Sequence, residues 1–471
     1  MLIDVTRSLP IPLPAQVAAS LRSAIATGAL HPGDEVPSTR VLARQAGVSR
    51  GTIVTAYDQL VSEGYLTATQ GAPTRVNPSL PAVAARDRSS DVSTPSQSTQ
   101  LPDRGVAGQL GRTRSLISLK PSSGHAGAIR PAAWRQAWRE AAADPAITAE
   151  PTGQHALRHA ITEHLRTGRG MSVDAQDVIV SGGTREGLVL ALMALASGTP
   201  LRVGVEDPGH PGLRKIIPLA GHAVVTCAVD SDGIDVSTLP PDLDAVVVTP
   251  SFQYPLGASI PAARRRELLD WATSTRTVVI EDDFNAELRY RTAPLPPLAS
   301  LRTDADVVTL GTFSTLLNRS VAAGYVVAGE PLIDRLRHTR TMLGMPVSPV
   351  TQLAVAHLLR NGHVRRNTKA VHNRLSRRRA LIEADVIPQL TGRGAVVTEM
   401  AESNGVDLAV TFTDSAARDG FARELAEHGI ESGRLDALWS GRDDGLILSF
   451  AHLSDPDFQR VCGVLGEITR P

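Results

Sequence analysis

Six short apolar runs between residues 201 and 328 constrain the fold of this chain most strongly, because helical patterns or loops separate them. The runs cover residues 201–205, 223–229, 245–249, 277–280, 307–310 and 325–328. Such alternation predicts an α/β fold with a mostly parallel sheet that helices cover on both faces. Ligands of these folds bind beyond the carboxyl ends of the strands, so we expect a site there. The segments at those ends are residues 206–211, 249–257, 281–290 and 311–315.

Length, charge and cysteine content limit the number of domains and the kinds of partner that we expect. Domains cluster at roughly 100 to 200 residues, so a chain of 471 residues contains more than one folding unit. The formal net charge is zero, which restricts any contact with nucleic acid to a local patch. The sequence shows neither a membrane-length apolar run nor a signal-peptide pattern, so we expect a cytoplasmic protein without a membrane partner. Cys227 and Cys462 stand outside any Cys-x-x-Cys spacing and predict neither a disulfide framework nor a zinc site.

The N-terminal part shows the pattern of a small DNA-binding module. Apolar residues at helical spacing predict a first helix that ends near Gly28. Ser38 and Ser49 stand where N-caps belong, before a short second helix and a third helix. This is the spacing of a helix-turn-helix, whose second helix can lie in the major groove. Residues 65–69 and 75–76 then flank a stretch rich in turn residues, which predicts a hairpin wing.

The motifs of this module resemble the GntR-family winged helix. They are found at residues 37–43, 47–53, 56–60 and 63–66. From geometry alone, Arg50 at the start of the recognition helix is the best candidate for a bidentate contact with guanine, worth about 1 to 3 kcal/mol of discrimination. The alternative, a helical packing module without DNA, is disfavoured because caps, turns and arginines agree. The residues that the resemblance implies at DNA are Arg40, Ser49, Arg50, Thr52, Gln70, Gly71 and Thr74.

A polar, serine-rich stretch without apolar periodicity separates this module from the rest of the chain. It cannot bury enough surface to fold alone, and as a flexible coil it would span roughly 35 Å. We therefore expect a DNA-binding domain at residues 1–76, a linker at 77–114 and a larger domain at 115–471. Within the larger domain we expect a large part at about 150–340 and a smaller C-terminal α+β subdomain at about 341–471.

The larger domain resembles the large domain of fold-type I aminotransferases. The motifs occur in the family's order, at residues 151–153, 206–209, 249–257, 281–283 and 311–314. With the winged helix in front, the whole chain is similar to MocR-type (GabR-like) transcription factors. The resemblance implies a sequence-specific regulator that binds a double-stranded DNA operator at two half-sites as a head-to-tail homodimer.

In that family pyridoxal phosphate is bound to a lysine as a Schiff base. An aspartate holds the pyridine nitrogen, and a helix start with hydroxyls and an arginine holds the phosphate. Asp282 matches the aspartate, and Gly183 and Thr184 match part of the phosphate site. Arg185 stands where the family usually has glutamine. A ligand role for Asp282 and a purely structural one, as a cap or ion-pair partner, both stay open.

Thr315 takes the place of the lysine, and its hydroxyl cannot form an imine. The family's phosphate arginine falls at Ala322, and Arg319 is a candidate substitute. Ser314 beside Thr315 has no histidine–carboxylate pair to activate it, so we interpret it as a structural hydroxyl. The remaining departures are Phe284 and His210 for tyrosines and Phe252 for a histidine.

These departures predict a domain that is not an enzyme and holds no covalent cofactor. Lysine occurs only at Lys120, Lys215 and Lys369, and Lys215 is a weak substitute at best. We expect a body for dimerisation and for sensing an effector, a small anion or an amino-acid-like compound. Non-covalent pyridoxal phosphate as effector is the alternative. The missing lysine argues against an active transaminase.

Two further patterns are better explained without a special function. His155 and His159 lie four residues apart with Glu163 one turn on, a spacing that can bind a metal. These histidines lie off the apolar face of their helix, so we predict a solvated surface and no metal. The arginine clusters at 264–266 and 377–379 could contact DNA phosphates, but exposed or dimer-forming helix faces are favoured.

Overall fold

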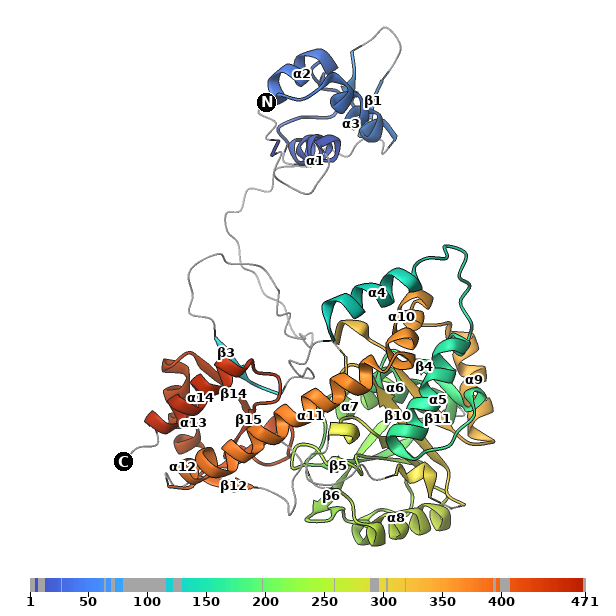
Figure 1. Cartoon of the computed structure of the whole chain (residues 1–471), viewed down its shortest axis with the longest axis vertical. Coiled ribbons are helices and arrows are strands. Elements are labelled where there is room, and N and C mark those ends of the chain that lie inside the picture. The colour runs from blue at the N-terminus through green and yellow to red at the C-terminus, as the bar shows by residue number, and fades with distance from the viewer. Residues whose placement is uncertain are drawn as a thin grey trace, which may run out of the picture. The chain divides into compact units, whose positions relative to one another are not determined.

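The computed structural model divides the chain into two compact units, residues 1–109 and 110–471, which are described separately. Figure 1 shows their helices and strands. The structure describes residues 5–6, 13–26, 28–62, 65–68, 73–78, 116–121, 129–196, 198–257, 259–288, 296–301, 304–317, 319–392, 395–398 and 407–468. In these residues no helix is both long and apolar enough to cross a membrane.

The first unit is a winged helix, as predicted. Its helices are α1 (Leu13–Ala26), α2 (Thr39–Ala46) and α3 (Arg50–Ser62), and its hairpin consists of β1 (Leu66–Thr67) and β2 (Arg75–Val76). The core is apolar and buried, because α1 and α2 pack against α3, and α3 also packs against β1. Core residues with no exposed surface include Val17, Leu21, Leu42, Ile53, Leu60 and Val76.

The two predicted N-caps differ. The hydroxyl of Ser49 accepts a hydrogen bond from the backbone N–H of Thr52 at 3.2 Å, which caps α3. Ser38 occupies the N-cap position of α2 but makes no capping hydrogen bond through its side chain. The α2 helix ends at Gly47, whose φ of 63° lies in the left-handed region that favours glycine.

The second unit contains a mostly parallel sheet, which confirms the predicted fold class. In the described residues eight strands follow the order β4-β11-β10-β9-β8-β5-β6-β7, and only β11 and the short β7 run against the others. The six predicted runs all form strands, whereas the sequence did not indicate β4 or β7. The strands are β4 (Val178–Ser181), β5 (Arg202–Asp207), β6 (Ala223–Asp230), β7 (Gly233–Ile234), β8 (Ala245–Val248), β9 (Val278–Asp282), β10 (Val307–Thr312) and β11 (Gly324–Ala328).

Helices cover both faces of this sheet (Figure 1). Alternate residues of one strand enter different cores: Val178 and Val180 join the core with α4, α5 and α10, and Ile179 joins the core with α6, α7 and α9. The strands β8 and β9 at the centre of the sheet are buried throughout because neither of their faces meets water, whereas β6 is partly exposed. The helices are α4 (Pro131–Ala141), α5 (His155–Arg169), α6 (Thr184–Leu195), α7 (Pro211–Leu219), α8 (Ala262–Thr275), α9 (Leu332–Leu343) and α10 (Pro349–Arg360).

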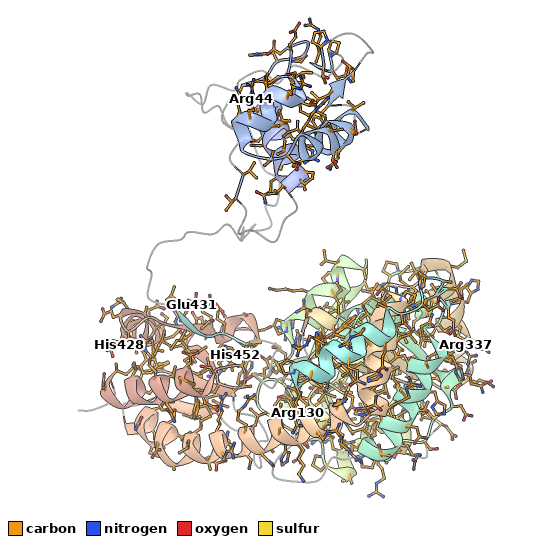
Figure 2. The ribbon with its side chains drawn as sticks, turned by 45° about the horizontal axis from the view of Figure 1, so that its top comes forward. Arg44, Arg130, Arg337, His428, Glu431 and His452 are labelled. Carbon is orange, nitrogen blue, oxygen red and sulfur yellow. The ribbon has the colours of Figure 1, made fainter. Side chains whose placement is uncertain are left out.

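The long helix α11 (His363–Leu381) leads to a smaller sheet with strand order β12-β13-β15-β14-β3 (Figure 1). The edge strand β3 (Ile117–Leu119) comes from the start of the domain and pairs in parallel with β14 (Ile430–Arg434). Lys120 beside β3 forms an ion pair with Glu431, labelled in Figure 2. The remaining elements are α12 (Ile387–Gly392), β12 (Val396–Thr398), β13 (Asp407–Thr411), α13 (Ser415–Glu427), β15 (Gly445–Ser449) and α14 (Asp455–Ile468).

Single turns complete the unit and carry several site residues. They are η1 (Ala175–Asp177), η2 (Val236–Thr238), η3 (Ala286–Leu288), η4 (Leu298–Ser300), η5 (Arg319–Val321), the π-turn η6 (Ile382–Val386) and η7 (Leu435–Ala437).

Candidate ligand pocket and DNA-binding surface

A cavity of about 230 Å³ lies where the predicted strand ends meet the start of α6. Phe252 stands just outside it and contacts Phe284, with ring centroids 5.6 Å apart. Arg319 belongs to η5, but its side chain lies outside the described part of the chain. The residues that line the cavity are Gly182, Gly183, Thr184, Arg185, His210, Asp282, Phe284, Thr312, Ser314, Thr315 and Ala322.

The tip of β10 places Thr315 at this cavity. Gly311 is required there, because a Cβ atom would lie 2.0 Å from the ring of Tyr325. Phe313 is fully buried and packs against the same ring at 5.8 Å between centroids. The backbone N–H of Ser314 then donates to the hydroxyl of Thr312 at 3.1 Å and turns the chain. Thr315 is therefore held at the cavity with 8% exposure.

Among the described residues that line this cavity, none is a lysine. Lys120 is engaged with Glu431, and Lys369 is exposed on α11. Lys215, the weak substitute considered above, is exposed on α7.

Asp282, at the end of β9, forms the floor of the cavity and is 2% exposed. It accepts a hydrogen bond from the backbone N–H of Phe284 at 3.3 Å. Burial raises the pKa of Asp282 to about 8, and the nearby carboxyls of Asp283, Glu206 and Glu281 act in the same direction. No ion pair of Asp282 occurs within the described ranges, which leaves the carboxyl facing the cavity without a cation.

The opposite end of the cavity suits an anion. The first amides of α6 have no acceptor within the helix, and the helix dipole favours negative charge there. Arg185 extends from this turn to α7, where a Cβ atom on Gly212 would lie 2.4 Å from its guanidinium. Burial, and then the charge of Arg185, lowers the pKa of His210 to about 4. His210 Nδ1 accepts from the N–H of Gly212 at 3.0 Å, so the ring is neutral and its Nε2 carries the proton.

An aromatic wall lies between these two ends. Phe284 is its centre, with ring centroids 6.0 Å from His210 and 5.9 Å from Tyr254. Only 3% of the residues in the chain are aromatic, so this concentration marks a surface for a flat or apolar group. Leu438 and Trp439 of the C-terminal subdomain pack on the same cluster.

One buried ion pair and one buried carboxyl with two hydrogen bonds lie next to the residues of the site, and the sequence did not indicate either. Arg169 donates to Asp283 at 2.6 Å and to the hydroxyl of Ser251 at 3.2 Å, with both charged side chains almost fully buried. Glu206 accepts from both the hydroxyl and the N–H of Thr249. Carboxylates after strands are visible in the sequence, but their partners stand too far along the chain to be assigned by spacing.

The interpretation of the arginine clusters as exposed or dimer-forming helix faces is wrong for Arg265, Arg378 and Arg379, which are buried. Arg265 is 3% exposed and donates to three backbone carbonyls, those of Ile260, Pro296 and Pro250. Arg378 is equally buried and donates to the carbonyl of Phe450 at 2.8 Å. Such side chains hold loops in place and are not accessible to DNA phosphates.

The winged helix presents arginines without partners. Arg40 and Arg50 are exposed, and in the described part of this unit neither guanidinium has a hydrogen bond or ion pair. The same holds for Arg44, one turn beyond Arg40 on α2 and labelled in Figure 2, which the sequence reasoning missed although the four-residue spacing indicates it. Ser49 and Thr52 lie at the start of α3, and Thr74 lies before β2. The wing-tip residues Gln70 and Gly71 lie outside the described residues.

Two family descriptions match the chain. "Bacterial regulatory proteins, gntR family" matches residues 13–76, and "Aminotransferase class I and II" matches residues 122–430. Among solved structures, an archaeal alanine:glyoxylate aminotransferase superimposes with a TM-score of 0.66 at 18% identity, over 76% of this chain and 91% of that chain. This likeness concerns the fold alone. A winged-helix reader joined to an aminotransferase-like domain defines a class of transcription regulators.

Relatives over the whole length narrow this class to one family. The HTH-type pyridoxine biosynthesis transcriptional regulator PdxR of Corynebacterium glutamicum is 38% identical, over 98% of this chain and 96% of that protein. The probable rhizopine catabolism regulatory protein MocR of Rhizobium meliloti is 30% identical, over 96% and 93%. The chain belongs to the MocR-type family of DNA-binding transcriptional regulators, as the sequence motifs predicted.

Proposed function

We propose that the aminotransferase-like domain of this regulator senses a small ligand and catalyses no transamination. The observation that carries the proposal is Thr315 at the tip of β10, in a cavity that none of the lysines lines. Transamination starts from an imine between pyridoxal phosphate and an amine, and a threonine hydroxyl cannot form one. The hydrocarbon rings of Phe252 and Phe284 further reduce the polar groups available to a cofactor.

The cavity fits a ligand with two unlike ends. A carboxylate or phosphate fits at the first amides of α6 beside Arg185. A basic nitrogen fits at Asp282, because a cation there would offset the cost of a buried carboxylate. The ring of Phe284 offers a surface to a flat group between them.

Non-covalent pyridoxal phosphate is the specific candidate for this ligand. Its pyridine nitrogen fits Asp282 and its phosphate fits the α6 end, whereas its aldehyde has no amine to react with. When bound through a lysine, the cofactor supplies an electron sink; here it would serve only as a ligand. The 38% identity to a regulator named for pyridoxine biosynthesis favours this candidate. An amino-acid-like anion with the same two ends is the alternative.

We further infer a head-to-tail homodimer with each winged helix near the partner's large domain. In this arrangement residues 1–76 read DNA, 77–114 link, and 115–471 dimerise and bind the effector. Two readers require two half-sites on the operator. A ligand can change DNA binding only through a difference in its affinity for the DNA-competent and incompetent arrangements.

The Arg50→Ala variant tests the reading of DNA by the recognition helix. Loss of a bidentate guanine contact should weaken specific operator binding by about fivefold to about 150-fold while the dimer mass stays unchanged. The measurement is a titration against the DNA upstream of the protein's own gene, at fixed salt, with sedimentation as a check on assembly. The control is Arg135→Ala, an exposed arginine on α4. Unchanged operator affinity in Arg50→Ala would refute the assignment.

A further inference from the structure

A second cavity lies in the same unit, away from the pocket just described. Its volume is about 370 Å³, larger than the first, and it is enclosed by α5, the turn η3, the end of α10 and the start of α11. Phosphate and small dicarboxylate ions are compact, so the space is sufficient for such a ligand. The side chains that give it its chemistry are His159, Glu163, His164, Glu287, Arg360 and Arg365.

The carboxylates of this cavity are already neutralised. Glu287 lies 2.6 Å from Nε2 of His164, with side-chain exposures of 14% and 10%. Burial opposes the charge on His164, but the carboxylate of Glu287 outweighs it and the pKa of His164 is raised. Burial likewise opposes the charge on Glu287, yet the charge of His164 and its hydrogen bond lower the pKa of Glu287. Glu163 forms an ion pair with Arg166 at 2.8 Å.

The two arginines have no such partner. Arg360 ends α10 and Arg365 lies in the first turn of α11. Across the described ranges neither guanidinium has a hydrogen bond or ion pair, and both side chains are exposed at the cavity. The start of α11 adds the partial positive charge of its first amides. With the carboxylates paired, the cavity keeps an excess of positive charge.

His159 adds a third donor. Its ring has no hydrogen-bond partner among the described side chains, and its nearest ring neighbour is His155 at 6.3 Å between centroids. The metal spacing that these histidines suggested has no support in the described residues, where no group of three histidine, cysteine or carboxylate side chains could hold an ion. An imidazole beside two guanidiniums suits an anion better than a cation.

A side-chain contact links the lining of the second cavity to the tip of β10. His164 packs against Phe313, with ring centroids 6.1 Å apart. The neighbours of Phe313, namely Thr312 and Ser314, line the first cavity. Thr312 and Ser314 thus line the first cavity, and Phe313 between them contacts a residue that lines the second.

We propose that this second cavity binds a small anion bearing carboxylate or phosphate groups, held by Arg360, Arg365 and His159. Guanidinium groups bind both kinds of oxyanion through paired charge-assisted hydrogen bonds, which is why the two sources share one site. Such a ligand would be separate from the one that faces Asp282.

Calorimetric titration of the full-length protein with inorganic phosphate, and separately with succinate, tests this site at low ionic strength. The Arg360→Ala/Arg365→Ala double variant should lose affinity for at least one of the two anions by about tenfold or more. The control pair Arg135→Ala/Arg139→Ala, on the exposed face of α4, should bind as the parent does. Arg185→Ala removes the guanidinium of the first cavity and identifies any anion bound there.

The outcome separates three cases. Loss of binding in the Arg360/Arg365 pair but not in Arg185→Ala supports the second site, and the anion that loses more identifies the ligand chemistry. Equal losses in both arginine pairs mean unspecific charge and overturn the proposal. Unchanged anion binding together with weakened operator binding would assign the arginines to DNA, and would also overturn it. Arg50→Ala remains an independent test of operator reading, so failure here leaves the proposed regulator function standing.

Discussion

Asp282 is the residue on which the chemistry of the first pocket depends. It is buried without a cation, and burial raises its pKa to about 8. At neutral pH the Asp282 carboxyl therefore carries a proton in a large share of the molecules and can donate a hydrogen bond. Asp282 lines the same cavity as Thr315, and such a group can donate a hydrogen bond to the ligand proposed for this pocket.

The Asp282→Asn variant should show this in the pH dependence of stability. Because the folded state holds the proton more tightly than the unfolded state, the parent loses stability as pH rises from about 4 to about 8, and asparagine does not. The advantage of the variant over the parent should thus grow across this window. Urea unfolding at about pH 5 and about pH 8 measures it.

The exposed Asp270→Asn is the matched control and should show the same stability difference from the parent at both pH values. If the difference in free energy of unfolding between Asp282→Asn and the parent stays constant across this pH window, burial does not raise the pKa of Asp282, and the role given to this carboxyl is wrong.

Single residues were predictable from sequence where a motif fixed their place. Thr315, Asp282 and His210 all line one cavity, because each follows a strand of the same sheet. The ion pair of Arg169 with Asp283 was not predictable, because the two residues are 114 positions apart and only the fold brings them together.

At the scale of elements, α3 carries Arg50 and Thr52, two of the residues proposed to read DNA, and Ser49 caps its start. Ile53 and Leu60 bury one face of the helix, and Ser49 satisfies one amide at its exposed start. Ser38 stands in the same position before α2 without that bond. The two serines therefore form a natural pair for comparison.

Ser49→Ala should lower the free energy of opening α3 by about 1 kcal/mol, because one helix-start amide loses its acceptor. Ser38→Ala should cost clearly less, since no capping bond is lost. Hydrogen exchange of the backbone amides of α2 and α3 in the full-length protein measures both. Equal effects of the two substitutions would contradict the assignment of the cap.

The sequence predicted those elements whose apolar pattern is local. All six apolar runs form strands; β8, β9 and β11 are buried throughout, whereas β6 is partly exposed. β3 has three residues, and it pairs with β14 near the other end of the chain, so neither length nor periodicity indicated it. β4 has four buried residues, but only three of them are apolar, and the sequence did not indicate it.

At the scale of the whole molecule, the net charge of zero is compatible with two different uses of arginine, one in each unit. Arginines of the second unit such as Arg169, Arg265 and Arg378 are buried and hold its loops and carboxylates. Arg40 and Arg50 of the winged helix are exposed and have no partner in the described part of that unit. Basic charge is thus available where the family resemblance places DNA, although the chain as a whole is not basic.

The central claim is that an aminotransferase fold serves here as a sensor without a covalent cofactor. It is tested most directly by incubating the full-length protein with pyridoxal phosphate, recording the absorption spectrum, reducing with borohydride and mapping any adduct by mass spectrometry. The account predicts no internal-aldimine band and no stoichiometric adduct at one lysine, with at most reversible binding. A stoichiometric reduced adduct on Lys120, Lys215 or Lys369 would contradict it.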